Sequence, residues 1–143
     1  MKTLAEIYAA IPKVECRQLC SEQCSLILLG KVELDAMEKA FGGVLSHKPG
    51  CLSCPALDTF TKTCTVYDVR PFICRLFGAS RKLMCPHGCK PERQMTDQEE
   101  HALLLAYNRI VGGLEPMPGM ETIAEGTLGS LVGTNSKPRR TGY

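Results

Sequence analysis

Two helices are predicted in the amino-terminal third of the chain. Residues 3–11 predict a short helix that ends at Pro12, because proline removes a backbone donor and crowds the preceding turn. In residues 32–41 apolar side chains recur at helical spacing, and Gly42 and Gly43 then favour a stop. These segments predict two helices separated by a cysteine-rich stretch.

Two further helices are predicted in the second half of the chain. Pro71 suits the first turn of a helix over residues 70–77, and a glycine follows that segment directly. Thr96 and Glu99 form a capping box at the start of residues 96–111, where an apolar stripe continues to the next glycine. The signal is strongest in this last segment, because its start, its stripe and its stop agree.

The segment between residues 16 and 29 combines a cysteine triplet with a short apolar run. Cys16, Cys20 and Cys24 stand at positions i, i+4 and i+8, which is one face if the segment is helical. Gly30 would end such a helix. A helix over residues 16–29, with its three cysteines on one face, is therefore a conditional prediction.

The remaining stretches indicate irregular structure. Gly, Pro, Ser, Thr and Cys dominate residues 47–64, and a second irregular stretch surrounds residues 85–89. Residues 65–67 favour a short extended piece. A chain of 143 residues suits one compact domain with a tail. We expect a cysteine-rich metal-binding domain at residues 1–113 and a loosely ordered C-terminal tail at residues 114–143, where Gly, Pro, Thr and Ser are frequent.

Composition and charge narrow the possible partners. The chain has 17 Lys and Arg against 15 Asp and Glu, and a net charge of +2 creates no global field for nucleic acid or an anionic membrane. The longest apolar run, residues 26–29, is far below the roughly 20 residues of a membrane helix. Residues 1–14 offer no clear secretory cleavage site. We expect a cytoplasmic protein without membrane contact, and the charge balance disfavours nucleic acid.

Nine cysteines are the main chemical feature of the chain. A reducing cytoplasm keeps thiols reduced, so a cysteine cluster there indicates metal binding or catalysis before a disulfide framework. Cys51 and Cys54 have a two-residue spacing that lets two thiolates bind one ion from a tight turn. Disulfides, or thiols packed as small apolar side chains, are the alternatives. The candidate metal ligands are Cys16, Cys20, Cys24, Cys51, Cys54, Cys64, Cys74, Cys85 and Cys89, and His87 is either a ligand or a loop residue.

Geometry and local charge bear on how these thiols share metal. In an ideal helix the Cα atoms of Cys16 and Cys24 lie roughly 12 Å apart, whereas two sulfurs on one zinc ion lie under about 5 Å apart. Either the helix is broken, or the thiols are divided between sites, or they surround a larger polynuclear cluster. Residues 61–93 carry a local charge of +5, and nearby cations lower thiol pKa values and stabilise thiolates.

Two neighbouring motifs carry a family resemblance. The first is Cys51-Leu-Ser-Cys54-Pro-Ala-Leu-Asp58, and the second is Cys64-Thr-Val-Tyr67-Asp68-Val-Arg70-Pro71-Phe-Ile-Cys74-Arg75-Leu-Phe77-Gly78. With the upstream cysteine triplet, the chain resembles the YkgJ-type, or CxxCxxCC, family of zinc- or iron-chelating proteins over residues 16–93. In this chain Cys24 is followed by Ser25, where the family has adjacent cysteines.

The resemblance implies metal chelation by about eight cysteines, with zinc or iron as the metal. We expect a zinc ion first and an iron–sulfur cluster as the alternative. Arg70 and Arg75, which belong to the second motif, are the candidate cofactor-binding residues. A similar domain accompanies flagellin lysine methylation, so an iron–sulfur-dependent enzyme or enzyme subunit in group transfer or redox chemistry is the alternative function.

The first function that we expect is a metal-organised interaction module with a protein partner. No Ser/His/Asp set, paired acids or phosphate-binding glycine loop is found in the sequence, and its three histidines are not spaced as a catalytic metal triad. No catalytic residue is therefore assigned. The expected fold is a small single domain, mainly α, of about four to five helices with irregular metal-bound loops.

Overall fold

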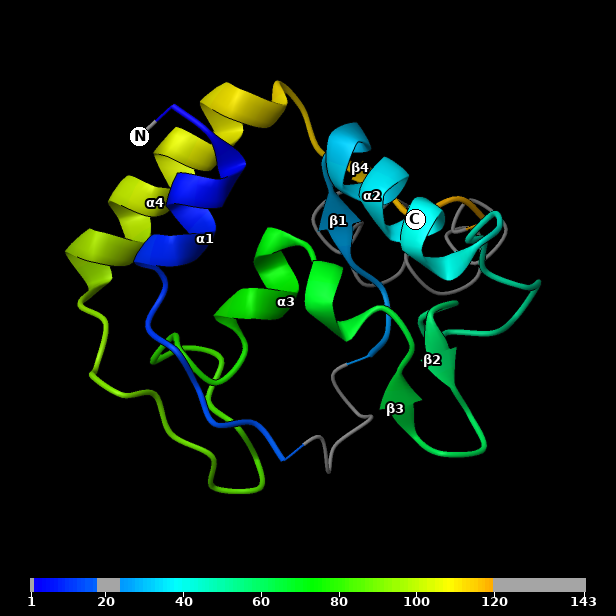
Figure 1. Ribbon diagram of the computed structural model, residues 1–143, viewed down its shortest axis with the longest axis horizontal. Helices are drawn as coiled ribbons and strands as arrows, with labels where there is room; N and C mark the ends of the chain where they lie inside the picture. Colours follow the sequence, from blue (N-terminus) through cyan, green and yellow to red (C-terminus); the bar gives the residue numbers. More distant parts are fainter. Residues whose placement is uncertain (1, 18–23, 120–143) are drawn as a thin grey trace, which may run out of the picture.

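The computed structural model of the protein describes residues 2–17 and 24–119, and this part of the chain contains four α-helices (Figure 1). Helices make up 37% and strands 9% of these described residues, so this part of the chain is only partly helical. No helix of the described residues is long and apolar enough to cross a membrane. The elements in chain order are α1 (Leu4–Ala10), β1 (Leu28–Leu29), α2 (Lys31–Phe41), β2 (Leu57–Asp58), β3 (Thr63–Cys64), the 3₁₀-helix η1 (Tyr67–Val69), α3 (Phe72–Leu76), α4 (Asp97–Val111) and β4 (Glu115–Pro116).

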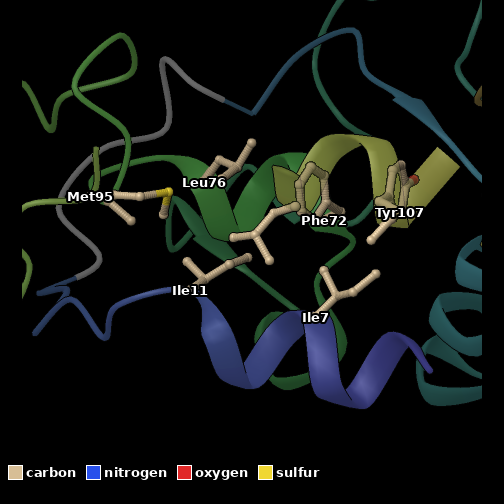
Figure 2. Close-up of a cluster of buried hydrophobic side chains, with 9 residues drawn as sticks. Ile7, Ile11, Phe72, Leu76, Met95 and Tyr107 are labelled. Carbon is tan, nitrogen blue, oxygen red and sulfur yellow. The ribbon is translucent and has the colours of Figure 1, made fainter. Parts of the chain in front are cut away.

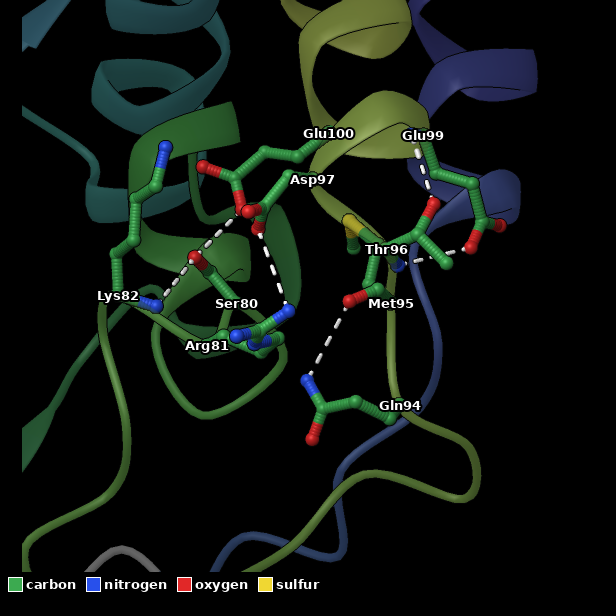
Figure 3. Close-up of polar contacts among 9 residues, drawn as sticks. All are labelled: Ser80, Arg81, Lys82, Gln94, Met95, Thr96, Asp97, Glu99 and Glu100. Carbon is green, nitrogen blue, oxygen red and sulfur yellow. Dashed lines mark hydrogen bonds and ion pairs between the residues drawn. The ribbon is translucent and has the colours of Figure 1, made fainter.

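The four unconditional helix predictions are confirmed, and capping explains where α1 and α4 begin. Before α1, the Thr3 hydroxyl accepts a bond from the Glu6 N–H at 3.2 Å. Before α4, the Thr96 hydroxyl accepts a bond from the Glu99 N–H at 3.1 Å (Figure 3). In both boxes the glutamate carboxylate accepts a return bond from the threonine N–H. Helix α2 ends, as expected, at Gly42, whose φ of 85° lies in the left-handed region.

The first of two cores lies between α1, α3 and α4. Helix α1 lies beside α4 (Figure 1). Ile7 of α1 and Ile11, which caps the end of this helix, point toward α3, which contributes Phe72 (Figure 2). The rings of Phe72 and Tyr107 stack with their centroids 4.3 Å apart. The buried members of this first core are Ile7, Ile11, Phe72, Leu76, Ala79, Met95, Leu103, Ala106 and Tyr107.

The second core lies against α2. Strand β1 pairs antiparallel with β4, and β2 pairs antiparallel with β3 so that Leu57 faces Cys64. Gly30, between β1 and α2, allows a close approach to α4, because a Cβ at this position would lie 2.7 Å from the Cβ of Val111. The buried members of this second core are Ile27, Leu29, Met37, Leu45, Ala56, Val66 and Met117.

A buried carboxylate connects the helices of both cores. Glu33 of α2 is 2% exposed, and its Oε2 accepts bonds from the Tyr8 hydroxyl at 2.5 Å and the Phe72 N–H at 2.6 Å. Its Oε1 accepts bonds from the Tyr107 hydroxyl and from the Gly30 N–H. Burial, together with the hydrogen bond to Glu33, raises the pKa of both tyrosines. Helices α1, α2, α3 and α4 therefore meet at one side chain.

The conditional helix over residues 16–29 is wrong for residues 24–29. Residues 24–27 are irregular, and β1 follows them. Ile27 and Leu29 are both buried in the second core, and β1 gains its backbone partner from β4 far along the chain. Local periodicity does not reveal such long-range pairing. The middle of the predicted helix, which includes Cys20, lies outside the described residues.

The region predicted as loop over residues 47–64 contains the short β2–β3 hairpin. The extended piece predicted at residues 65–67 is instead a turn that leads into η1, with a bond from the Val69 N–H to the Val66 carbonyl at 3.0 Å. The hydroxyl and the N–H of Thr65 both donate to the Ala56 carbonyl, at 2.6 and 2.9 Å. These two hydrogen bonds to one carbonyl follow the end of the hairpin, where the chain turns toward α3.

The packed part of the chain extends into the predicted tail, residues 114–143. Strand β4 pairs with β1, and Met117 is fully buried in the second core. The His47 N–H donates to the Pro118 carbonyl at 2.8 Å, which holds the segment after β4 against the loop that follows α2. The first residues of the predicted tail are thus part of the fold, and residues 120–143 lie outside the described residues.

We expect Glu33→Ala to lower the free energy of unfolding by about 3–5 kcal/mol, because four donors lose their acceptor at a buried site. Asp35→Ala is the matched control on α2. The Asp35 carboxylate is 57% exposed and pairs with Lys31, so its loss should change stability by less than about 1 kcal/mol. Chemical denaturation followed by circular dichroism measures both variants. Similar losses in the two variants would contradict the central role of Glu33.

We expect Met117→Ala to cost about 2–5 kcal/mol of stability, since it leaves a cavity in the second core. Met84, which is 69% exposed, provides a matched substitution of the same residue type. Met84→Ala should change the free energy of unfolding by no more than about 0.5 kcal/mol. Thermal denaturation of the two variants compares them directly. A Met117→Ala protein as stable as Met84→Ala would mean that the segment after β4 does not contribute to the fold.

Candidate metal centre

Seven cysteines line a single cavity of about 410 Å³. Its wall includes Ile11 of the first core and Ile27 and Met37 of the second, so the cavity lies where the two cores adjoin. Four separate stretches of the chain supply the thiols. They are the amino-terminal segment between α1 and β1, the β2–β3 hairpin with the turn before it, α3, and the loop before α4. The cysteines are Cys16, Cys24, Cys54, Cys64, Cys74, Cys85 and Cys89.

Four of these thiols belong to the wall formed by the second core. Cys54, Cys64 and Cys74 pack against that core. The Cys54 N–H donates to the Cys24 carbonyl at 3.0 Å, and the Leu57 N–H donates to the Cys54 carbonyl at the same distance. Because Leu57 also faces Cys64 across the hairpin, Cys24, Cys54 and Cys64 are held by one backbone network. Cys74 comes from α3.

The other three thiols lie where the amino-terminal segment runs beside the loop before α4. Val14 and Pro91 form an isolated antiparallel bridge, and the adjoining backbone bond from Glu92 N–H to the Lys13 carbonyl is 2.8 Å long. This pairing places Cys16 next to the stretch that carries the other two thiols, Cys85 and Cys89. The Arg17 Nη2 donates to the His87 carbonyl at 2.6 Å, and the His87 N–H donates to the Cys85 Sγ at 3.3 Å.

Burial raises the pKa of two thiols at the second core, Cys74 and Cys54. It raises the pKa of Cys74 to about 12, and the neighbouring Cys54 and Cys64 add to this effect while the Arg70 charge opposes it. Burial also raises the pKa of Cys54. At neutral pH the metal-free Cys74 thiol is therefore protonated. A metal ion that binds it must displace the proton.

Hydrogen bonding lowers the pKa of Cys89, whereas burial raises that of Cys74. The backbone N–H of Arg17 and then its guanidinium donate to the Cys89 sulfur, and they lower the pKa of this thiol. The same contact raises the pKa of Arg17. Arg17 lies outside the cationic stretch of residues 61–93, and its position directly after Cys16 is the one sequence signal for this role. The cavity thus contains thiols of two different acidities.

Arg70 and Arg75 both line the cavity and hold the entry to α3. The Arg70 guanidinium lies over the Tyr67 ring at 3.7 Å from its centroid, and that of Arg75 lies over the Tyr8 ring at 4.0 Å. Their Nε atoms donate to the carbonyls of Tyr67 and Arg70, at 2.9 and 2.7 Å. Burial lowers the pKa of Arg75. Since these bonds go to neutral carbonyls, the two positive charges are available to offset thiolates.

The structure brings Cys54 to the cavity without its predicted partner Cys51, whose side chain is exposed elsewhere. His47 Nδ1 lies 3.2 Å from the Cys51 carbonyl, and His47 is 5% exposed, a burial that no sequence motif indicated. His87 is exposed beside two thiols. His101 is exposed on α4. The ninth cysteine, Cys20, lies outside the described residues.

Within residues 2–17 and 24–119, no three Cys, His, Asp or Glu side chains are grouped closely enough to hold a metal ion. The seven thiols share a cavity but do not converge on one point in it. The donor set itself fits a thiophilic metal, because zinc and iron–sulfur clusters are both held by cysteine thiolates. Binding would require the thiols to move together, and most of them lie on or beside irregular segments.

Comparisons with known proteins gave no relative. No family model matches the chain, and no curated protein or solved structure matches it either.

We expect Cys89 to react with iodoacetamide at neutral pH about tenfold faster than Cys74, because a thiolate is the nucleophile and the two pKa values are shifted in opposite directions. Peptide mass spectrometry of reduced, chelator-treated protein measures the rates. Arg17→Ala should slow the reaction of Cys89 with iodoacetamide and leave the reaction rate of the exposed Cys51 unchanged. Equal rates at Cys89 and Cys74 would contradict the assigned acidities.

Proposed function

We propose that this protein binds zinc or iron through the cysteines of the cavity and acts as a metal-organised interaction module. The observation that supports this proposal is the gathering of seven thiols from four separate stretches of chain around one cavity. Inert cysteines packed as small apolar residues would be distributed through both cores, yet the buried members of the first core include no cysteine.

Charge and energetics favour the same function. A centre with four thiolates keeps negative charge, and Arg70, Arg75 and Lys62 line the cavity that would contain it. Aromatic residues are only 6% of the chain, and no Trp is present, so large core side chains are scarce. A structural zinc ion contributes on the order of 10–16 kcal/mol to the folding of small domains. Such an ion would join stretches of chain that few regular elements connect.

The hairpin between β2 and β3 offers a contact surface for a protein partner. Phe60 at its tip is 94% exposed. The turn is well defined, because Asp58 Oδ1 accepts a bond from the Phe60 N–H at 2.9 Å and the Lys62 N–H binds the Asp58 carbonyl at 2.7 Å. Cys54 precedes this hairpin and Cys64 ends it. A metal held by these two thiols would fix the hairpin that presents an aromatic side chain.

An iron–sulfur-dependent enzyme or enzyme subunit, in group transfer or redox chemistry, is the second candidate. The number of thiols favours it, since seven around one cavity exceed the four that a single tetrahedral zinc ion takes. The resemblance to the YkgJ-type family is compatible with either metal. Eight residues of its second motif line the cavity, and they include both of its cysteines, Cys64 and Cys74. We place zinc first because no cluster-type cysteine run is found in the sequence.

Metal analysis of protein made and purified without oxygen tests this function. We expect a colourless protein with zinc and little iron, whereas a brown protein with stoichiometric iron and acid-labile sulfide would establish the second candidate. Cys74→Ser should lose most of the metal, because this thiol is buried in the cavity wall. Cys51→Ser should keep it, because the Cys51 side chain is exposed and does not line the cavity.

Circular dichroism of both variants shows whether loss of metal follows from loss of fold. A wild-type protein that carries no metal, and that takes up neither zinc nor iron after reduction, would rule out the proposed function. Equal metal content in Cys74→Ser and Cys51→Ser would rule out this cavity as the metal centre.

A further inference from the structure

The thiols of the cavity form two groups that are attached to different parts of the fold. Cys54, Cys64 and Cys74 pack against the second core, and Cys24 is joined to them through the 3.0 Å bond from Cys54. None of these four lies in the loop before α4. Cys74 stands on α3, whose Phe72 and Leu76 belong to the first core, and its own side chain packs against the second core.

The remaining thiols are attached to the first core. The loop that carries Cys85 and Cys89 begins at Ser80, which is 1% exposed and donates to the Glu100 carboxylate of α4 at 2.6 Å (Figure 3). The Lys82 N–H then donates to the Ser80 hydroxyl at 3.1 Å. Met95, at the far end of the loop, is buried in the first core. The loop is thus anchored at both ends to the helix α4 region.

Cys16 belongs with this second group. It follows α1, which packs on α4, and it lies after the Val14–Pro91 bridge that joins the amino-terminal segment to the loop. Its neighbour Arg17 is bonded to the His87 carbonyl between the two loop cysteines. Cys16 also contacts the Tyr67 hydroxyl, which marks the border between the two groups.

The electrostatic interactions of the thiols divide them into the same two groups. Cys74 interacts with Cys54, Cys64 and Cys24, whereas Cys89 interacts with Arg17 and Cys85. The first group has four thiols, which is the number of ligands that a tetrahedral zinc site takes once the thiols move together. The second group has three described thiols and is more exposed, with Cys16 at the surface.

We propose that the cavity contains two separable thiolate metal sites: an inner site formed by Cys24, Cys54, Cys64 and Cys74, and an outer site that includes Cys16, Cys85 and Cys89. This inference rests on the proposed metal-binding function and assigns its ligands. The inner site would fasten the hairpin and α3 to the second core. The outer site would fasten the amino-terminal segment to the loop before α4, and each site would take a thiophilic divalent ion.

Titration of the reduced, metal-free full chain with Co²⁺, followed by displacement with Zn²⁺, tests the division. Thiolate-bound Co²⁺ absorbs visible light, so uptake is counted directly by absorbance and confirmed by elemental analysis. We expect about two ions per wild-type chain and the same number for Cys51→Ser. The outer variant Cys85→Ser/Cys89→Ser should lose about half of the bound Co²⁺ and keep the tetrahedral spectrum of a four-thiolate site.

The inner variant Cys54→Ser/Cys64→Ser should lose the other half, and circular dichroism reports whether it stays folded. If it unfolds, the outer variant still decides the question. Loss of all metal from the outer variant would show one shared polynuclear centre, and loss of none would show that its thiols are not ligands. Either result overturns the division and leaves metal binding intact. A wild-type chain that binds neither ion overturns the division, and one that also takes up no iron after reduction overturns the proposed function with it.

Discussion

Glu33 brings a carboxylate into the interior, where it receives hydrogen bonds from two tyrosine hydroxyls and two backbone N–H groups. A buried carboxylate without such donors would cost several kcal/mol. Tyr8 comes from α1 and Tyr107 from α4, so these helices must meet α2 at this point. The packing of the first core is tied to that requirement, because Phe72, which donates one of the bonds, is also a buried member of that core.

The same carboxylate helps to place the cavity. Its bond to the Phe72 N–H is made at the first residue of α3, and Cys74 lies two residues further along this five-residue helix. Arg70, which precedes the helix, and Arg75, in its last turn, stack on the rings of Tyr67 and Tyr8. A structural requirement of the helices therefore fixes one thiol and two cations, while the hairpin and the loop before α4 bring the other thiols to the same space.

The Cys74 and Cys89 thiols differ in acidity because their surroundings differ. Burial disfavours the thiolate at Cys74, and direct hydrogen bonds from Arg17 favour it at Cys89. A metal ion would have to displace a proton from the first thiol and would find the second more readily ionised. These differences connect the proposed metal chemistry to the packing, since the second core supplies the burial and the amino-terminal segment supplies the arginine.

Local signals in the sequence determined the helices α1, α2, α3 and α4, because capping residues, apolar spacing and the proline before α3 act within a few residues. The cysteine positions were also evident, as was the cationic stretch around them. The tertiary structure alone decided that residues 24–29 form an irregular segment and a strand, that β4 and Met117 belong to the fold, and that Cys54 reaches the cavity while Cys51 does not. The reason is physical: strand pairing, burial of Glu33 and the neighbours of each thiol depend on residues distant in the chain, which local periodicity does not report.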